Sequence, residues 1–111
     1  MIQDPVKAAP KAFKVILEND RVWVLDYQAK PGEKEPVHSH PDSFIYSLSP
    51  YNIKINFPDG KTEIRKGKAG EAIWQKAETH SSENMGRADA RALIVELNEP
   101  KMKGAQKKKK K

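Results

Sequence analysis

Short runs of β-branched and aromatic residues recur along this chain, and turn-forming residues separate them at intervals of about 8 to 12 positions. No segment shows the 3.6-residue period of an amphipathic helix. Many short strands with regular turns and no helix are typical of a β-sandwich or a closed β-barrel. The sequence therefore predicts an all-β domain.

The strands can be placed approximately by their composition. We expect strands at 12–18, 21–27, 43–48, 51–57, 61–65, 71–75 and 88–98. Loops are expected at 28–40, up to the paired histidines, and around His80, because glycine, proline and polar residues gather there. Alternation within 43–48 predicts that Phe44, Tyr46 and Leu48 point inward.

Charge and proline divide the chain into three parts. Seven of its 21 basic residues lie from Lys101 onward, where there is no acidic residue, so residues 1–100 hold 14 basic and 15 acidic side chains. We expect an extended arm at 1–11, a barrel at 12–100 and a disordered lysine-rich tail at 101–111. The tail favours at most weak, salt-dependent contact with nucleic acid, and a solvated tail is the simpler interpretation.

Several classes of protein are excluded by composition. The chain has no cysteine, which rules out disulfides, thiolate metal sites and thiol catalysis. No apolar run is long enough to span a membrane, and no apolar block near the start resembles a secretory signal. We therefore expect no membrane association and a cytoplasmic location.

The only three histidines have an informative spacing. His38 and His40 are two positions apart, so on an extended strand both imidazoles lie on one face, about 6 to 7 Å apart along the backbone. His80 is the one remaining imidazole that could complete a site with them. The pattern predicts that these three residues bind a divalent transition metal: iron, zinc, nickel, copper or manganese.

At these residues the sequence resembles the cupin superfamily, in particular its small single-domain members. Gly32, five residues and then His38-Ser39-His40 match the first motif of that family, and Gly70, His80 and Asn84 match the second. The resemblance covers roughly residues 12–98 and implies a small jelly-roll-like β-barrel, or double-stranded β-helix, with the three histidines as metal ligands. It also implies a homodimer, for which the arm before Lys14 is suited to pair with a neighbour's edge strand.

One family feature is missing from the first motif. The resemblance implies a glutamate ligand three or four positions after His40, where this chain has Phe44 and Ile45. Asp42 is the nearest carboxylate that could replace it, and Phe44 is expected to fill the vacant slot. The fold is specified by these motifs much more narrowly than the function, because cupins host many unrelated activities.

Other residues near the motifs have two interpretations each. Phe44, Tyr46 and Trp74 either line a substrate pocket or fill the core, and Asn84 is expected to brace the loop of His80. Solvated surface positions are the simpler interpretation for Glu71, Glu78 and Glu83, which otherwise could act as bases.

Two hypotheses about function remain open at this stage. The first is a three-histidine metal-dependent enzyme, such as a dioxygenase, that acts on a small polar and preferably anionic molecule. The second is a non-catalytic module that binds a metal or a small ligand in the barrel mouth. No nucleophile or general base is identifiable, so the sequence does not choose between them.

Overall fold

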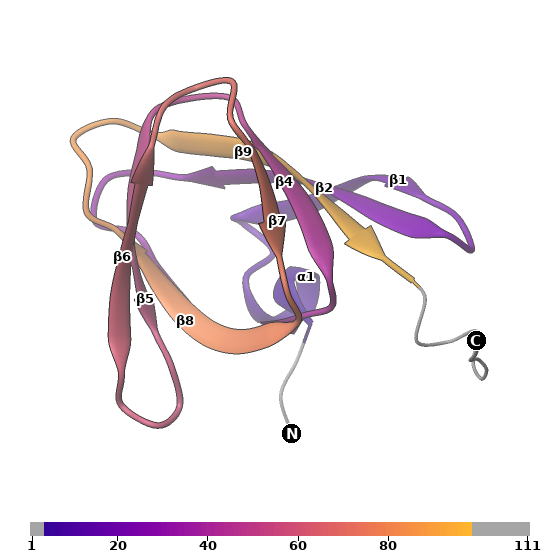
Figure 1. Ribbon diagram of the computed structural model, residues 1–111, viewed down its shortest axis with the longest axis horizontal. Helices are drawn as coiled ribbons and strands as arrows, with labels where there is room; N and C mark the ends of the chain where they lie inside the picture. Colours follow the sequence, from indigo (N-terminus) through magenta and orange to yellow (C-terminus); the bar gives the residue numbers. More distant parts are fainter. Residues whose placement is uncertain (1–3, 99–111) are drawn as a thin grey trace.

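The computed structural model describes residues 4–98, and the predicted tail at 101–111 lies outside these residues. One short helix, α1 (Pro5–Ala8), precedes nine strands (Figure 1). The strands are β1 (Phe13–Glu18), β2 (Val22–Ala29), β3 (Lys34–His40), β4 (Ser43–Ser47), β5 (Tyr51–Asn56), β6 (Thr62–Gly67), β7 (Ala72–Gln75), β8 (Glu78–Asn84) and β9 (Ala90–Leu97). The all-β prediction is confirmed.

The strands form two antiparallel sheets that face each other. Five strands make the larger sheet in the order β1-β2-β9-β4-β7, and four make the smaller sheet in the order β3-β8-β5-β6. Neighbours in each sheet are mostly distant in sequence, so the chain crosses repeatedly from one sheet to the other (Figure 1). A turn at Gly60, with a φ of 93° that favours glycine, closes the β5–β6 hairpin.

The core lies between the inner faces of the two sheets. Phe13, Leu25, Tyr27 and Ile94 from the larger sheet are buried against Ile53 and Ile55 from β5. Period-two alternation explains which residues are buried, because every second residue of each strand points between the sheets. Ile53 and Ile55 therefore share the inner face of β5.

The expected extended arm is wrong for the part that the structure describes. Asp4 accepts a hydrogen bond from the Lys7 amide at 2.9 Å, and Pro5 occupies the first position of α1. A capping carboxylate and a proline with a preset φ both favour a helix start. Pro5 and Ala9 are buried against their own chain, so this segment is not free to pair with a neighbour's edge strand.

Two segments predicted as loops are strands instead. β3 and β8 pair with each other and carry all three histidines, although both are rich in polar residues. Their cross-strand hydrogen bonds and the burial of one face outweigh the low β-propensity of this composition. The predicted barrel limits at 12 and 100 stay a prediction, since residues 99–111 lie outside the described part.

No helix within residues 4–98 has the length and apolar composition needed to cross a membrane.

Shortening a side chain at the centre of the core should lower the stability of the protein. Leu25 is fully buried, so Leu25→Ala removes apolar contacts and leaves a cavity, and we expect a loss of about 2–5 kcal/mol in the free energy of unfolding. Leu48→Ala is the matched control because Leu48 is 42% exposed, and it should cost well under half as much. Denaturant unfolding of both variants measures the difference, and equal losses would contradict this core.

Candidate metal centre

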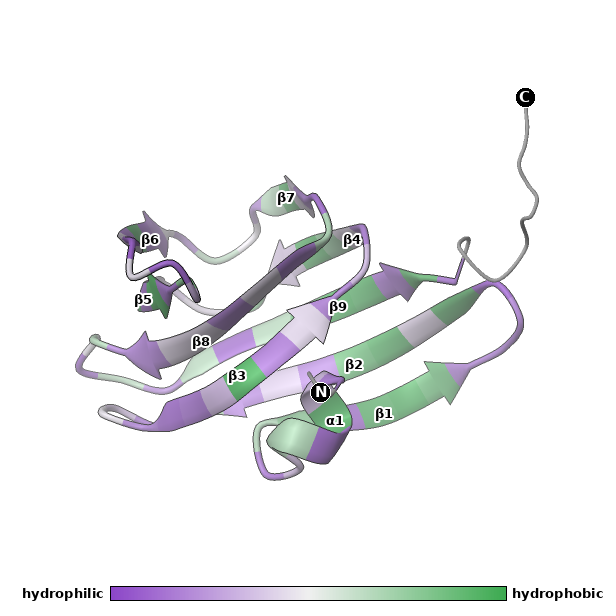
Figure 2. Cartoon of the chain, turned by 90° about the horizontal axis from the view of Figure 1, so that it is seen from below, coloured by the Kyte–Doolittle hydropathy of each residue, from purple (hydrophilic) through white to green (hydrophobic). Residues whose placement is uncertain are grey.

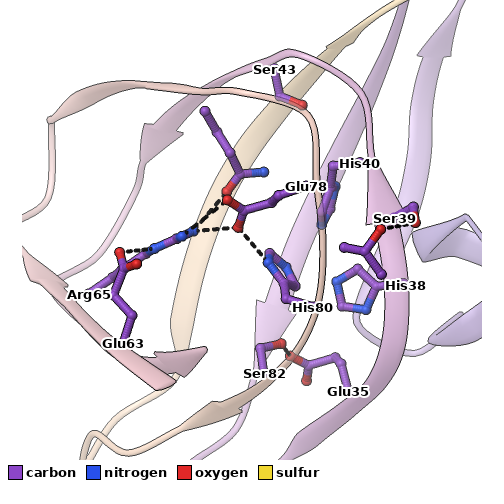
Figure 3. Close-up of polar contacts among 12 residues, drawn as sticks. Glu35, His38, Ser39, His40, Ser43, Glu63, Arg65, Glu78, His80 and Ser82 are labelled. Carbon is purple, nitrogen blue, oxygen red and sulfur yellow. Dashed lines mark hydrogen bonds and ion pairs between the residues drawn. The ribbon is translucent and has the colours of Figure 1, made fainter. Parts of the chain in front are cut away.

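Pairing of β3 with β8 brings the three histidines together. His38 lies directly opposite His80 in the antiparallel register, and His40 follows His38 on the same face. Ligand atoms from the three imidazoles all lie within 4.8 Å of one another, and all three residues are buried (Figure 3). The structure therefore unites the residues that the sequence singled out, and one small ion fits the spacing.

Each imidazole is held in place through its Nδ1 atom. His38 Nδ1 lies 2.6 Å from the Pro36 carbonyl oxygen, His40 Nδ1 2.6 Å from Glu96, and His80 Nδ1 2.5 Å from Glu78. The Pro36 carbonyl oxygen and the ionised Glu78 carboxylate can only accept, so Nδ1 carries the proton in His38 and His80. Such contacts orient metal-bound histidines and leave Nε2 with a free lone pair.

His38 provides a direct test of whether the site suits a metal. Its Nε2 atom is fully buried and has no hydrogen-bond partner within residues 4–98. A buried nitrogen lone pair without a donor costs free energy, and native structures rarely leave one unmatched. A metal ion at the meeting point of the three rings would satisfy it, so the residues present fit the group.

Burial keeps the three imidazoles neutral. It lowers the pKa of His38, His40 and His80 from 6.5 to about 4, because the charged forms lose solvation. Phe13 contributes to this dry environment, with its ring centroid 5.2 Å from that of His38 and 5.8 Å from that of His40. Neutral imidazole is the form that binds transition metals.

Glu78 links the histidine cluster to Arg65. It accepts hydrogen bonds from His80 and, through both oxygens, from the Arg65 guanidinium at 2.8 and 3.2 Å (Figure 3). Burial opposes ionisation of Glu78, but the hydrogen bonds from Arg65 and His80 outweigh it and hold the pKa of Glu78 below its usual range. The expected solvated position is wrong for this residue, which stays an acceptor for His80.

Glu96 is a site residue that the sequence reasoning missed. Its side chain is 5% exposed and contacts His40, and burial raises its pKa to about 7. Alternation along β9 contains the signal that would have revealed it. Ala90, Ile94 and Glu96 share the buried face, so an acidic residue in that series had to point toward the centre of the barrel.

The position of the missing family glutamate is filled by a different residue than predicted. Ser43, Ile45 and Ser47 form the inner face of β4, whereas Phe44 and Tyr46 are 38% and 40% exposed on the outer face. Ile45 therefore points toward the cavity where Phe44 was expected. Alternation separates two faces of a strand, and only packing against the other sheet decides which one is buried.

The remaining candidates also lie away from the metal position. Asp42 accepts a hydrogen bond from the Ala77 amide at 2.8 Å and is not among the clustered ligands. Trp74 borders the cavity but is 54% exposed and pairs with Phe44 on the outer face. Asn84 is buried and bonds to Ala29, Gly86 and Ala88, so it braces the turn after β8 and does not contact His80.

A cavity of about 560 Å³ opens onto the histidines. Ile45, Ile55, Ile73 and Ile94 contribute apolar walls, while Arg65 and Gln75 place polar groups beside the metal position. The volume of this cavity and its largely apolar lining with a few polar groups are typical of sites that enclose a small molecule. The arrangement can therefore expose one face of a bound ion to a ligand of modest size.

A second polar cluster lies in the wall below the histidines (Figure 3). Glu35 is buried and accepts hydrogen bonds from Ser82 at 2.6 Å and Tyr27 at 3.4 Å. Burial raises the pKa of Glu35 even though these hydroxyls oppose the change. The cluster ties β2 to both β3 and β8 on either side of the core.

No protein-family sequence model matches the chain, and no curated protein matches it in sequence. Solved structures do match it in three dimensions. A cupin domain from Bordetella pertussis superposes with a TM-score of 0.70 at 18% identity, covering 77% of this chain and 90% of the other. An RmlC-like cupin with a double-stranded β-helix fold from Methanocaldococcus jannaschii gives 0.64 at 14% identity, covering 85% of both chains. The chain therefore has the small cupin fold that the motifs predicted.

An enzyme is also among the similar structures. The polyketide cyclase RemF from Streptomyces resistomycificus gives a TM-score of 0.56 at 25% identity, covering 78% of this chain and 63% of the cyclase.

Acid should destabilise the metal-free protein. Each histidine has a lower pKa folded, about 4, than unfolded, 6.5, so the unfolded state binds more protons between these values. One such histidine lowers the free energy of unfolding by up to about 1.4 kcal/mol for each pH unit of acidification. Glu35 and Glu96 act in the opposite direction because their pKa values are raised in the folded state.

The three histidines that destabilise the folded state in acid outnumber the two carboxyl groups that stabilise it. The free energy of unfolding should therefore fall as the pH falls from about 6.5 toward 4. Denaturant unfolding of the chelator-treated protein at several pH values measures it. A stability that stays level or rises over this window would contradict the neutral, buried state of the imidazoles.

Proposed function

We propose that this protein, a cupin in fold, binds one divalent transition metal through the Nε2 atoms of His38, His40 and His80. The observation that carries the proposal is the buried Nε2 of His38, which has no hydrogen-bond partner within residues 4–98 and lies close to the ligand atoms of His40 and His80. Iron(II), zinc, nickel, copper and manganese all accept imidazole ligands. When bound, the ion would supply Lewis acidity or, in the case of iron, a site for dioxygen chemistry.

We further propose that the centre acts on a small anionic molecule, such as a carboxylate or a thiolate. Three neutral ligands leave the charge of a bound ion uncompensated and leave coordination positions open. Lys66 and Lys76 line the cavity and form no salt bridge within residues 4–98, whereas Arg65 and Arg91 are already paired with carboxylates. Isoleucines supply apolar walls that would orient the rest of the molecule and exclude water. Glu78 accepts a hydrogen bond from His80 Nδ1 and so keeps the proton on that nitrogen, which leaves the lone pair of Nε2 available to the ion.

Metal-dependent catalysis is the activity that we favour, with a dioxygenase as the leading form. Similarity to the cyclase RemF supports the idea that this fold can host an enzyme. A non-catalytic binding module is the second candidate, and one observation favours it. Glu78 and Glu96 are both engaged in holding imidazoles, so neither is free to act as a general base.

Metal analysis of the purified protein, followed by oxygen-uptake assays with small thiols and carboxylic acids, separates these two candidates. Stoichiometric iron with substrate-dependent uptake supports the enzyme. Ligand binding without turnover supports the module. The homodimer and the cytoplasmic location inferred from the sequence stay predictions.

Removing any one ligand should abolish tight metal binding. His38→Ala, His40→Ala and His80→Ala each leave two imidazoles, and we expect loss of stoichiometric zinc binding in calorimetric titration. Glu63→Gln is the control, because Glu63 bonds to Arg65 but to no histidine, and it should bind zinc within about twofold of the parent. Unchanged zinc affinity in the three alanine variants would contradict the site.

Weakening the hydrogen bond between Glu78 and His80 should reduce zinc affinity less than the loss of a ligand does. Glu78→Gln keeps the shape of the side chain but removes the charge that fixes the Nδ1 proton, so zinc affinity should fall about 10- to 100-fold. The same titration measures this change. An affinity equal to that of Glu63→Gln would show that Glu78 serves only to hold Arg65.

A further inference from the structure

A polar row crosses the inner face of the larger sheet beside the metal position. Cross-strand register places Gln75 of β7 opposite Ser43 of β4, and Ser43 opposite Glu96 of β9. All three residues are buried, and Glu96 contacts His40 at 2.6 Å. Directly opposed residues of antiparallel strands point to the same side of a sheet, so the whole row lies on the side of the histidines.

Gln75 is the member of this row whose hydrogen-bond donors are free within residues 4–98. Ser43 donates to the Pro41 carbonyl oxygen, and Glu96 is already in contact with a histidine. Gln75 Oε1 accepts from Arg65 at 3.1 Å, and a guanidinium can only donate, so the orientation of the amide is fixed. Gln75 is 9% exposed and lines the cavity, yet its Nε2 atom has no partner in that part of the chain and is not fully enclosed. A buried amide with two unpaired N–H donors points to a ligand that accepts from it.

Arg65 connects Gln75 with the histidine cluster. Its Nη1 atom donates both to Gln75 Oε1 and, at 2.8 Å, to Glu78 Oε2. The same Glu78 oxygen contacts His80 Nδ1 at 2.5 Å, and Figure 3 shows Arg65, Glu78 and His80 in this order. The free amide donors of Gln75 therefore lie in the part of the cavity that adjoins the metal position.

An apolar row runs beside the polar one, two residues away on each strand. It consists of Ile73, Ile45 and Ile94, which the register also sets opposite one another and which all line the cavity. Figure 2 shows hydrophobic colour along β7 and β9 and a hydrophilic band near the C-terminal end of each strand. Two residues of a strand cover about 7 Å, so a ligand of roughly three to five carbons with one end at Gln75 reaches the isoleucines with the other.

We propose that the ligand of this cavity is a short aliphatic carboxylate, and that Gln75 selects it over other small anions. The inference rests on the proposed metal binding, because the ion supplies the attraction for the negative charge. The carboxylate would lie between the ion and Gln75, accept a hydrogen bond from Nε2 and extend its chain along the isoleucine row. Carboxylate oxygens are strong acceptors and sulfur is a weak one, so the amide distinguishes a carboxylate from a thiolate.

Calorimetric titration of the zinc-loaded full chain with butyrate tests the hydrogen bond. Gln75→Leu removes the donor, and Gln75→Glu replaces it with a negatively charged acceptor while keeping an oxygen that accepts from Arg65. We expect butyrate affinity to fall about 10-fold in the first variant and further in the second. Gln28→Leu is the matched control, because Gln28 is exposed, bonds to Asp89 and does not line the cavity, and it should bind butyrate as the parent does.

Two further titrations test the selection and the apolar row. Propanethiol binds zinc as a thiolate but accepts weakly from an amide, so Gln75→Leu should change its affinity by less than about twofold. From acetate to butyrate, affinity should rise about three- to fourfold for each added CH₂ as the chain is buried, and Ile73→Ala should reduce this rise.

Circular dichroism and zinc titration of every variant separate a failure of the metal centre from a failure of this inference. If the parent binds zinc and Gln75→Leu binds butyrate as tightly as the parent, the role of Gln75 is overturned and the metal centre stands. A zinc-loaded parent that binds propanethiol but no butyrate has the same consequence. Loss of zinc binding in both Gln75 variants would show that Gln75 supports the metal centre and does not select a ligand. A parent that binds no zinc overturns the proposed function together with this inference.

Discussion

The pairing of β3 with β8 is the constraint on which the rest of this site depends. It sets His38 opposite His80 and leaves His40 one step along the same face, so three buried imidazoles meet at one place. Each Nδ1 atom then contacts an oxygen: that of Pro36 on β3 for His38, that of Glu78 on β8 for His80, and that of Glu96 on β9 for His40. Without those acceptors three buried rings could adopt either tautomer, and their Nε2 lone pairs would not point to a common position.

Acidic residues at the centre of the barrel illustrate how burial and pairing compete. Glu78 and Glu96 each contact the Nδ1 atom of one histidine, but of the two only Glu78 has a guanidinium beside it. The pKa of Glu78 is therefore lowered, whereas burial raises the pKa of Glu96 to about 7. Arg65 is therefore connected to His80 through Glu78, and it also lines the cavity.

Much of the fold was predictable because local composition and tertiary structure agree along most of the chain. The strands at 12–18, 51–57 and 88–98 are strongly apolar and alternate, and they appear close to where they were expected. β3 and β8 were expected as loops because their residues are polar, and only their pairing within the barrel explains them. Phe44 was placed inward for a related reason. Alternation identified the two faces of β4, and packing buried the face with Ser43 and Ser47.

The sequence by itself determined the all-β class, the cupin fold and the three residues that could hold a metal, because these depend on residue types and on spacing along one chain. Only the tertiary structure decided that Glu96 contacts His40 and that Ile45 takes the position expected for Phe44. These features join residues from different strands, and the register between distant strands arises from packing of the whole barrel and not from any local segment.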